Sequence, residues 1–330
     1  MSLAMPSLAP EPAILFVTAT RIGDAVLSTG LLGHLVDYYP GARFTIASGP
    51  VAAPLFADVP GLEKLIPLAK RRYAMHWLDL YRQVAGRRWD LVVDLRGSAL
   101  AWLLRKGERR VTAKGDPTLH RVVQLARCFE LVPPPVPRLW TKARHEAEAA
   151  RLIPGGPVLA IGPTANWIGK QWRAERFVEL IGRLTATSSI FAGARVAIFA
   201  APHERAAAQP VLDAVPADRL IDLTNEPDLL TVAATLRRTT LFIGNDTGLM
   251  HIAAAVGTPT LGLFGPSPAV QYSPWGRHTA VVQTELSYTE LVTAPDFDHR
   301  RTGTLMDTLS VDRVEAAAAA LFARSRVSAA

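Results

Sequence analysis

The 330-residue chain contains a single cysteine, Cys128. One thiol excludes a disulfide within the chain and any metal cluster built on several cysteine ligands. Cys128 lies in the stretch LARCFEL, on the apolar side of an expected helix. A small core residue is the better interpretation of such a position than a reactive nucleophile. The sequence therefore does not favour thiol chemistry.

Long apolar runs are also missing from the sequence. No stretch approaches the roughly 18 uninterrupted apolar residues that a membrane-spanning helix needs. The first residues, MSLAMPSLAPEPAILFV, have neither the basic start nor the long apolar core of a signal peptide. We therefore expect a cytoplasmic protein, whose contact with a membrane would be peripheral.

Acidic residues are fewer than basic ones. The chain has 36 Lys and Arg against 29 Asp and Glu, a formal net charge of +7. A basic surplus suits an anionic partner, such as nucleic acid, a phosphorylated small molecule or an anionic membrane surface. The sequence shows no basic tract interleaved with aromatic residues and no zinc-ligand spacing, so we expect no nucleic-acid partner.

What the sequence does contain is a repeated alternation of short apolar runs with helical patterns. In the first half the expected strands are AILFVTA (13–19), RFTIAS (43–48), KLIPL (64–68), DLVVDL (90–95) and RRVTA (109–113). The proline-rich stretch LVPPPVPRLW (131–140) then predicts a linker. The second half repeats the plan with VLAIGPT (158–164), RVAIFAA (195–201), LIDL (220–223), LFIGND (241–246) and PTLGLFG (259–265). Strands separated by helices predict two parallel sheets covered by helices.

The stretch LFIGNDTGLMHIAAAVGTPTLGLFG (241–265) joins a buried strand, Leu241–Gly244, to a helix expected over Leu249–Val256. The first backbone N–H groups of a helix have no partner within it, and such an end attracts phosphates. Asp246 complicates this interpretation because a carboxylate repels a phosphate. The alternative is that Asp246 or Thr247 only caps the helix. The stretch alone does not choose between the two.

A second strand-to-helix turn lies in TATRIGDAVLSTG (18–30), where Gly23 allows a tight turn and Asp24 is expected to begin the helix. Asp24 is either an N-cap or a carboxylate placed to take a proton from an acceptor hydroxyl. Both hypotheses fit the residues.

Two further turns lie in the second half. In GPTANWIGKQWRAERF (162–177), Lys170 precedes a helix, although cations suit helix C-termini. Lys170 is either a solvated loop charge or a group that neutralises a departing diphosphate. In FAAPHERAA (199–207), Glu204 either accepts a hydrogen bond from a ribose hydroxyl or is an acid favoured in a first helical turn.

Together these stretches resemble glycosyltransferase family 9, the lipopolysaccharide heptosyltransferases and their relatives. The resemblance rests on RIGDAVLSTGLL, on GKQWRAERF and on GNDTGLMHIAAAVGTPTLGLFGPS followed by PWG. It covers most of the chain and implies an α/β protein of the GT-B fold, with two facing Rossmann-like domains. The expected divisions are an acceptor-binding domain (1–150), a donor-binding domain (151–310) and a C-terminal helix (311–330) that returns to the first domain.

The resemblance also implies an activity. It is the inverting, metal-independent transfer of a heptose from ADP-heptose to an inner-core lipopolysaccharide acceptor, without a cofactor. The implied partners are a nucleotide-diphosphate sugar and an anionic glycolipid, with peripheral contact at the cytoplasmic face of the inner membrane. The alternatives are a nucleotide-sugar epimerase or hydrolase of the same architecture, or a non-catalytic sugar-nucleotide-binding protein.

Site residues follow from the matching motifs. Asp24 matches the general base, and Lys170 the lysine that contacts the donor phosphates. In the donor-binding turn, backbone N–H groups would hold the diphosphate while Asp246 faces sugar hydroxyls. The expected donor-binding residues are Thr164, Asn166, Glu204, Asp246, Thr247, Gly248 and His251. Arg21 and Arg96 are assigned to acceptor binding.

The chain departs from the family pattern at two places. Arg173 follows the tryptophan of GKQW where the family often has proline, and GPSPA (265–269) lacks an Asp that commonly follows GPT in the family. Both departures leave the identities of the two sugars open. The stretch DFDH (296–299) resembles the metal-binding motif of a different glycosyltransferase fold, but its late position predicts a surface loop.

Overall fold

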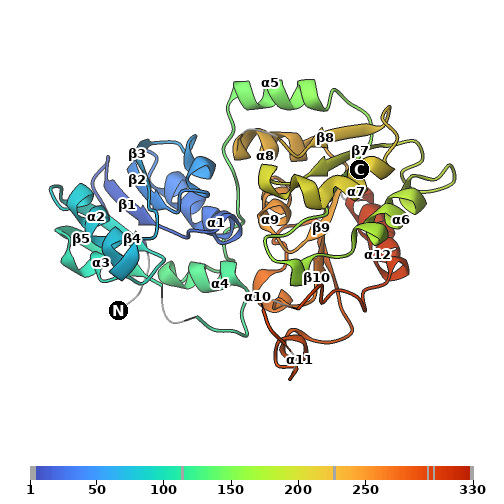
Figure 1. Ribbon diagram of the computed structural model, residues 1–330. Coiled ribbons are helices and arrows are strands. Elements are labelled where there is room, and N and C mark those ends of the chain that lie inside the picture. Colours follow the sequence, from blue (N-terminus) through green and yellow to red (C-terminus); the bar gives the residue numbers. More distant parts are fainter. Residues whose placement is uncertain (1–4, 113–114, 226–227, 296, 300–301, 328–330) are drawn as a thin grey trace. The chain divides into compact units, whose positions relative to one another are not determined.

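The structure is a computed structural model that describes residues 5–112, 115–225, 228–295, 297–299 and 302–327. The chain divides into two compact units, residues 1–142 and 143–330 (Figure 1). Each unit is described by itself.

The first unit is built on a five-stranded parallel sheet in the order β3-β2-β1-β4-β5. Its strands are β1 (Ala13–Val17), β2 (Arg43–Ser48), β3 (Leu62–Pro67), β4 (Trp89–Asp94) and β5 (Lys106–Val111). Every residue of β1 is buried, as expected for a central strand of a parallel sheet covered on both faces. The strands predicted in this half are confirmed, although the one expected over 109–113 begins three residues earlier, at Lys106.

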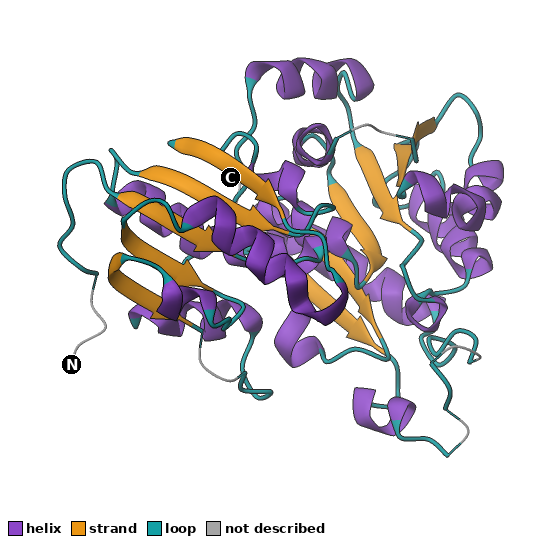
Figure 2. Cartoon of the chain, turned by 60° about the vertical axis from the view of Figure 1, so that its left-hand side comes forward, coloured by secondary structure: helices purple, strands orange, loops and turns teal. Residues whose placement is uncertain are grey.

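Helices cover both faces of this sheet (Figure 2). They are α1 (Ile22–Tyr38), α2 (Met75–Val84), α3 (Leu100–Leu103) and α4 (Arg121–Ala126), with 3-10 turns η1 (Ala53–Phe56), η2 (Arg72–Ala74) and η3 (Arg127–Phe129). Helix α3 is short, because β5 already begins at Lys106. Cys128 is buried, which confirms the core interpretation, and this burial raises the pKa of its thiol.

The proline-rich segment 131–140, which the sequence predicts as a linker, packs on α1. A Cβ atom on Gly30 would lie 2.3 Å from the carbonyl oxygen of Pro135, so only glycine allows this approach. The Arg138 side chain donates to the carbonyl of Gly33 and to Asp37, both at 2.7 Å. The segment therefore belongs to the first unit.

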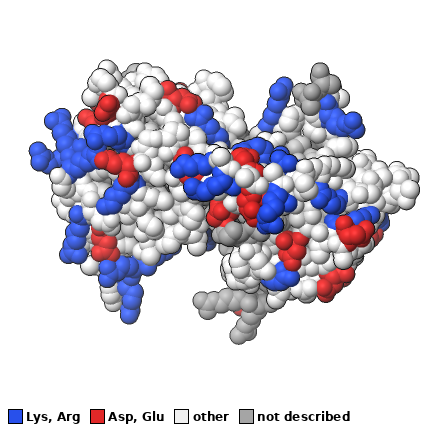
Figure 3. All heavy atoms as spheres, turned by 90° about the horizontal axis from the view of Figure 1, so that it is seen from above, with Lys and Arg blue, Asp and Glu red and all other residues white. Residues whose placement is uncertain are grey.

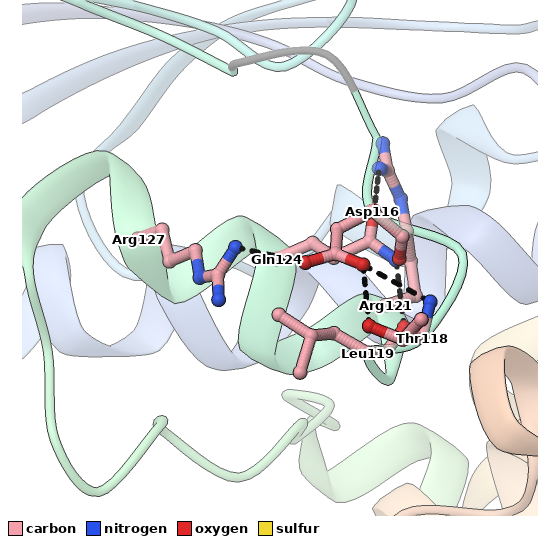
Figure 4. A network of polar contacts seen from close by, with 6 residues as sticks. All are labelled: Asp116, Thr118, Leu119, Arg121, Gln124 and Arg127. Atoms are coloured by element: carbon pink, nitrogen blue, oxygen red, sulfur yellow. Dashed lines mark hydrogen bonds and ion pairs between the residues drawn. The ribbon is translucent and has the colours of Figure 1, made fainter.

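The loop before α4 is closed by its own polar network (Figure 4). Asp116 accepts hydrogen bonds from the hydroxyl and backbone N–H of Thr118, and these bonds lower the pKa of its carboxyl. The Gln124 amide donates to the carbonyls of Asp116 and Leu119, and Arg127 lies 3.3 Å from the Asp116 carboxylate. The network ties this loop to α4.

The second unit is built on a six-stranded parallel sheet in the order β11-β10-β9-β6-β7-β8. Its strands are β6 (Val158–Gly162), β7 (Arg195–Phe199), β8 (Leu220–Leu223), β9 (Leu241–Asn245), β10 (Thr260–Phe264) and β11 (Thr279–Gln283). The strand order reverses between β6 and β9, as it does between β1 and β4 in the first unit. Ligands of such sheets bind beyond the carboxyl ends of the strands at this switch point. The predicted strands are confirmed, and β11 was not among them.

The second unit has more helices than the first among the described residues. They are α5 (Ala143–Leu152), α6 (Ala174–Thr185), α7 (Arg205–Ala214), α8 (Leu229–Arg237), α9 (Gly248–Ala255), α10 (Ala269–Tyr272), α11 (Tyr288–Val292) and α12 (Val311–Val327), with 3-10 turns η4 (Ile168–Lys170) and η5 (Pro202–Glu204). Residues of α6, α7 and α12 share one apolar core with the strands. No helix within the described ranges combines the length and apolar character needed to cross a membrane.

The two ends of the second unit bear on the predicted domain limits. Helix α5 packs against α8, and its Glu146 forms an ion pair with Arg237 at 2.5 Å. The predicted limit at residue 150 falls inside this helix. Helix α12 packs against α6, β10 and β11, and the return of the C-terminal helix to the first domain stays a prediction.

Candidate active site

The turn from β9 to α9 forms the helix start that the sequence indicated. Helix α9 begins at Gly248, one residue before the predicted start, and Thr247 occupies the N-cap position. The Thr247 side chain makes no capping hydrogen bond, and its buried hydroxyl has no hydrogen-bond partner among the described residues. Thr247 therefore stands at the N-cap position, but its side chain does not cap the helix.

Asp246 is paired with Lys170. The Lys170 Nζ lies 2.5 Å from Asp246 Oδ2, and the side chains are 24% and 9% exposed. His251 Nε2 lies 3.8 Å from the other carboxylate oxygen. The ammonium group offsets the carboxylate charge, so the helix start does not present an uncompensated anion to a phosphate. The ion pair with Lys170 therefore removes the objection that the Asp246 carboxylate would repel a phosphate at this helix start.

Lys170 ends the 3-10 turn η4, which is held tightly in place. A Cβ on Gly169 would lie 2.5 Å from the Trp167 ring, and the Gly169 carbonyl accepts from Leu305 N at 3.0 Å. The Trp167 ring in turn stacks on His299 with the centroids 4.4 Å apart. Lys170 is also the single lysine in residues 143–330, which otherwise use arginine for positive charge. An ammonium is a compact point charge, whereas a guanidinium is a planar fork.

Arg173, which replaces the proline of the family pattern, lies at the N-cap of α6. Its φ of −58° falls in the range that proline adopts, so the backbone conformation at this position is one that proline could also take. Its guanidinium binds Asp307 through two contacts of 2.5 and 2.6 Å, which lowers the pKa of that carboxyl. The preceding Trp172 is fully buried and donates to the Leu309 carbonyl. Arg173 therefore anchors the lysine loop to the segment before α12.

Thr164 and Glu204 join the loops that follow β6 and β7. The Thr164 hydroxyl donates to Glu204 Oε2 at 2.8 Å, and Ala201 N approaches the same oxygen at 3.4 Å. Thr164 is buried, whereas Asn166 is exposed in its loop. The structure thus connects Thr164 with Glu204 and Lys170 with Asp246, at the ends of neighbouring strands.

Asn245, the last residue of β9, was missed as a site residue from the sequence. It is fully buried, accepts from Trp172 N at 3.0 Å and donates to the Pro163 carbonyl at 2.9 Å. A polar amide at the end of an apolar strand was the only available signal. Its partners lie 73 and 82 positions away in the chain, so no local pattern could identify them.

In the first unit, Asp24 lies in the first turn of α1 but not at its cap. The helix begins at Ile22 and Arg21 is the N-cap, without a side-chain capping bond. The interpretation of Asp24 as the N-cap is therefore wrong, because the helix starts two residues earlier than predicted. An acid in the first turn still interacts favourably with the helix dipole.

Arg21 and Arg96 follow the adjacent strands β1 and β4. Arg21 is exposed, and the half-buried Arg96 lies with its guanidinium carbon 5.6 Å from the Trp77 ring centroid. The turn that carries Arg96 is fixed by the fully buried Asp94, which accepts from Arg96 N and from Ser98. Both arginines and Asp24 thus lie on turns at the carboxyl edge of the first sheet.

Across the residues that the structure describes, no group of three or more His, Cys, Asp or Glu side chains is placed to hold a metal ion. Asp296 of the DFDH stretch lies outside the described residues. The remainder of that stretch includes the exposed residues Asp298 and His299.

The chain combines two Rossmann-like parallel sheets with polar strand ends at both switch points, an architecture of nucleotide-handling α/β enzymes. The family model of glycosyltransferase family 9 (heptosyltransferase) matches residues 85–298, more than half of the chain. The chain belongs to this family and is a glycosyltransferase.

Individual relatives agree with this assignment. The chain is 25% identical to lipooligosaccharide heptosyltransferase 2 of Haemophilus influenzae over 300 residues, covering 79% of this chain and 85% of the relative. A family 9 glycosyltransferase structure from Veillonella parvula has a TM-score of 0.79 at 21% identity, with 97% and 99% of the two chains covered. The E. coli ADP-heptose lps heptosyltransferase II structure has a TM-score of 0.74 at 19% identity, covering 95% and 99%. The fold is that of the GT-B heptosyltransferase structures.

Proposed function

We propose that this protein transfers a heptose from ADP-heptose to an inner-core lipopolysaccharide acceptor, with inversion at the anomeric carbon and without a metal ion. The names of its relatives support the sugar and the acceptor class. The observation that carries the proposal is the Lys170–Asp246 pair beside the start of α9. It places the Lys170 ammonium, balanced by the Asp246 carboxylate, next to the first N–H groups of a helix at a Rossmann switch point.

The second unit binds the donor in this proposal. The first N–H groups of α9, from Gly248 onward, and the Lys170 ammonium bind the diphosphate. When the phosphates pair with the Lys170 ammonium, the Asp246 carboxylate can accept hydrogen bonds from sugar hydroxyls instead. Glu204, held by Thr164, accepts from the ribose, and the remaining donor contacts come from Asn166, Thr247 and His251. Lys170 then stabilises the charge on the departing ADP.

The first unit binds the acceptor. Asp24 takes the proton from the attacking hydroxyl as the new bond forms, and a single displacement inverts the anomeric carbon. Arg21 and Arg96 bind anionic groups of the acceptor. The basic surface of this unit attaches the protein peripherally to the cytoplasmic face of the inner membrane.

The test is an incubation with ADP-heptose and lipopolysaccharides truncated at successive inner-core positions. We expect the mass of one acceptor to rise by one heptose, and NMR of the product to show inverted anomeric configuration. A retained configuration would contradict direct displacement. Turnover of ADP-heptose without any acceptor would instead indicate an epimerase or hydrolase, and binding without turnover a non-catalytic protein. Deletion of the gene and mass analysis of the truncated lipopolysaccharide would identify the acceptor in the cell.

A further inference from the structure

The Lys170 loop and the β9–α9 turn are separate segments that meet at one ion pair. Lys170 lies on a loop that follows β6, and Asp246 follows β9. A contact between two such loops needs something that fixes their separation, because a misplacement of about 1 Å in an active site costs up to roughly 100-fold in rate.

The Asn245 amide joins three segments at this point. Its oxygen accepts from the backbone N–H of Trp172, two residues after Lys170. Its nitrogen donates to the carbonyl of Pro163 at 2.9 Å and approaches that of Thr164 at 3.4 Å, in the loop that leaves β6. Its own backbone ends β9, directly before Asp246. One side chain therefore connects both flanks of the lysine loop to the aspartate.

The position needs a side chain that both donates and accepts hydrogen bonds, and the Asn245 amide does so. Trp172 presents a donor and Pro163 an acceptor, so the bridging side chain must accept on one side and donate on the other. Asn245 is 0% exposed and Trp172 is 1% exposed, so these groups are removed from bulk solvent. An apolar residue would leave the Trp172 N–H and the Pro163 carbonyl without these partners, and buried unpaired groups drive local rearrangement.

We propose that Asn245 is a positioning residue that holds Lys170 in register with Asp246 and with the start of α9. It does not touch the donor and acts through the lysine. The effect of Asn245 on heptosyl transfer rests on the proposed function, whereas its effect on the position of Lys170 does not.

The first experiment measures Lys170 itself. Asn245→Leu keeps the size of the side chain and removes both hydrogen bonds, and Asn245→Ser is a second variant that retains a hydroxyl too short to bridge the loops. Because Lys170 is the single lysine in residues 143–330, mass spectrometry of its peptide reports its acetylation rate without ambiguity. We expect both variants to raise this rate several-fold. The matched control is Thr235→Val, which removes a buried hydrogen bond within α8.

The second experiment measures ADP binding by calorimetry and heptosyl transfer by kinetics. We expect Asn245→Leu to weaken ADP binding and to lower kcat/KM by roughly 10- to 100-fold. In a Lys170→Met background the same change should cost little more, because coupled residues have non-additive effects. The control Thr235→Val should lower only the melting temperature and leave ADP binding and kcat/KM unchanged.

The outcomes separate two hypotheses. If the Asn245 variants match Thr235→Val in Lys170 acetylation and ADP affinity, Asn245 is an ordinary core residue and the inference is wrong. Additive losses in the Lys170→Met background would overturn it as well. If acetylation of Lys170 rises as expected but the wild-type protein neither binds ADP nor transfers heptose, the proposed function fails while the positioning role stands.

Discussion

The two units share a plan but differ in charge. Residues 1–142 hold 19 of the 36 Lys and Arg and 11 of the 29 Asp and Glu, whereas residues 143–330 hold the remaining 17 and 18. The first unit therefore carries a net charge of +8 and the second −1, which together give the +7 of the chain. Figure 3 shows the same contrast, with blue side chains predominating over the first unit and blue and red mixed over the second.

Their strand ends differ too. In the second unit the polar residues contact one another, as Lys170 does with Asp246 and Thr164 with Glu204. Among the described residues of the first unit, the Asp94 carboxylate bonds only within its own turn, to Arg96 N and Ser98, and Arg21 is exposed at the helix cap. A small donor needs groups fixed in place before it binds, whereas a large anionic acceptor is attracted by a field that many charges produce. The contrast fits a donor site in the second unit and an acceptor surface in the first.

The largest expected effect comes from Asp24 in the first unit. Asp24→Asn keeps the shape of the side chain but cannot take a proton at neutral pH, and positioned bases contribute about 10²–10⁴-fold. We expect kcat to fall by roughly 10²-fold or more, with ADP affinity and melting temperature nearly unchanged. Asp37→Asn is the control, since Asp37 lies near the exposed end of the same helix and pairs with Arg138. If Asp24→Asn unfolds the protein while activity per folded molecule persists, the carboxylate only stabilises α1.

Substitution of Lys170 should have the next largest effect, and it should weaken ADP binding as well as transfer. Lys170→Met removes the charge that faces the diphosphate and leaves Asp246 uncompensated beside it. We expect ADP binding and kcat/KM to fall together by roughly 10- to 100-fold, because the charge acts in both ground and transition states. Adding Asp246→Asn should recover part of the ADP affinity by removing the repulsion. Unchanged ADP affinity in Lys170→Met would place the diphosphate elsewhere.

A smaller effect is expected from the basic surface of the first unit. Arg71 and Arg87 are paired with Asp79 and Glu63 at 2.6 and 2.5 Å, so Arg72 and Arg88 are the better probes of membrane contact. Near an anionic membrane each arginine contributes about 1 kcal/mol, or roughly fivefold in binding. We expect Arg72→Ser and Arg88→Ser each to weaken co-sedimentation with anionic vesicles by about that factor at low salt.

High salt and a substitution in the second unit provide the controls for this vesicle-binding experiment. High salt should abolish the vesicle binding of the wild-type protein, since exposed charges are screened. Arg277→Ser, an exposed position of the second unit, should leave it unchanged. Equal losses for all three variants would mean that the charge contrast between the units does not direct membrane contact.

The smallest expected effect is that of chelation. In the proposed mechanism, the N–H groups of α9 and the Lys170 ammonium neutralise the diphosphate, so EDTA should leave the transfer rate largely intact. The rate is measured before and after dialysis against EDTA. A loss that Mg²⁺ or Mn²⁺ specifically restores would show that a cation shares this task.

The parts of the fold that could be predicted are those decided by residues close to one another in the sequence. Buried strands such as β1 and β9 are apolar runs bounded by turn residues, and their positions are confirmed within about two residues. Helix starts were less predictable. Helix α1 begins at Ile22 after Arg21, a residue without a capping side chain, so no local signal marked its true start. The packing of the proline-rich segment, predicted only as a linker, could not be foreseen because its partner, α1, is about 100 residues away.

The sequence alone determined the alternation of strands and helices, the helix start after β9 and the presence of an acid, a hydroxyl and a lysine at strand ends. These follow from side-chain hydrophobicity and backbone preferences, which act over a few residues. The tertiary structure decided which of these groups meet. Lys170 pairs with Asp246 across 76 positions, and Asn245 bonds Trp172 across 73, because the parallel sheet places β6 beside β9. The strand order, and no local pattern, brings their carboxyl ends together.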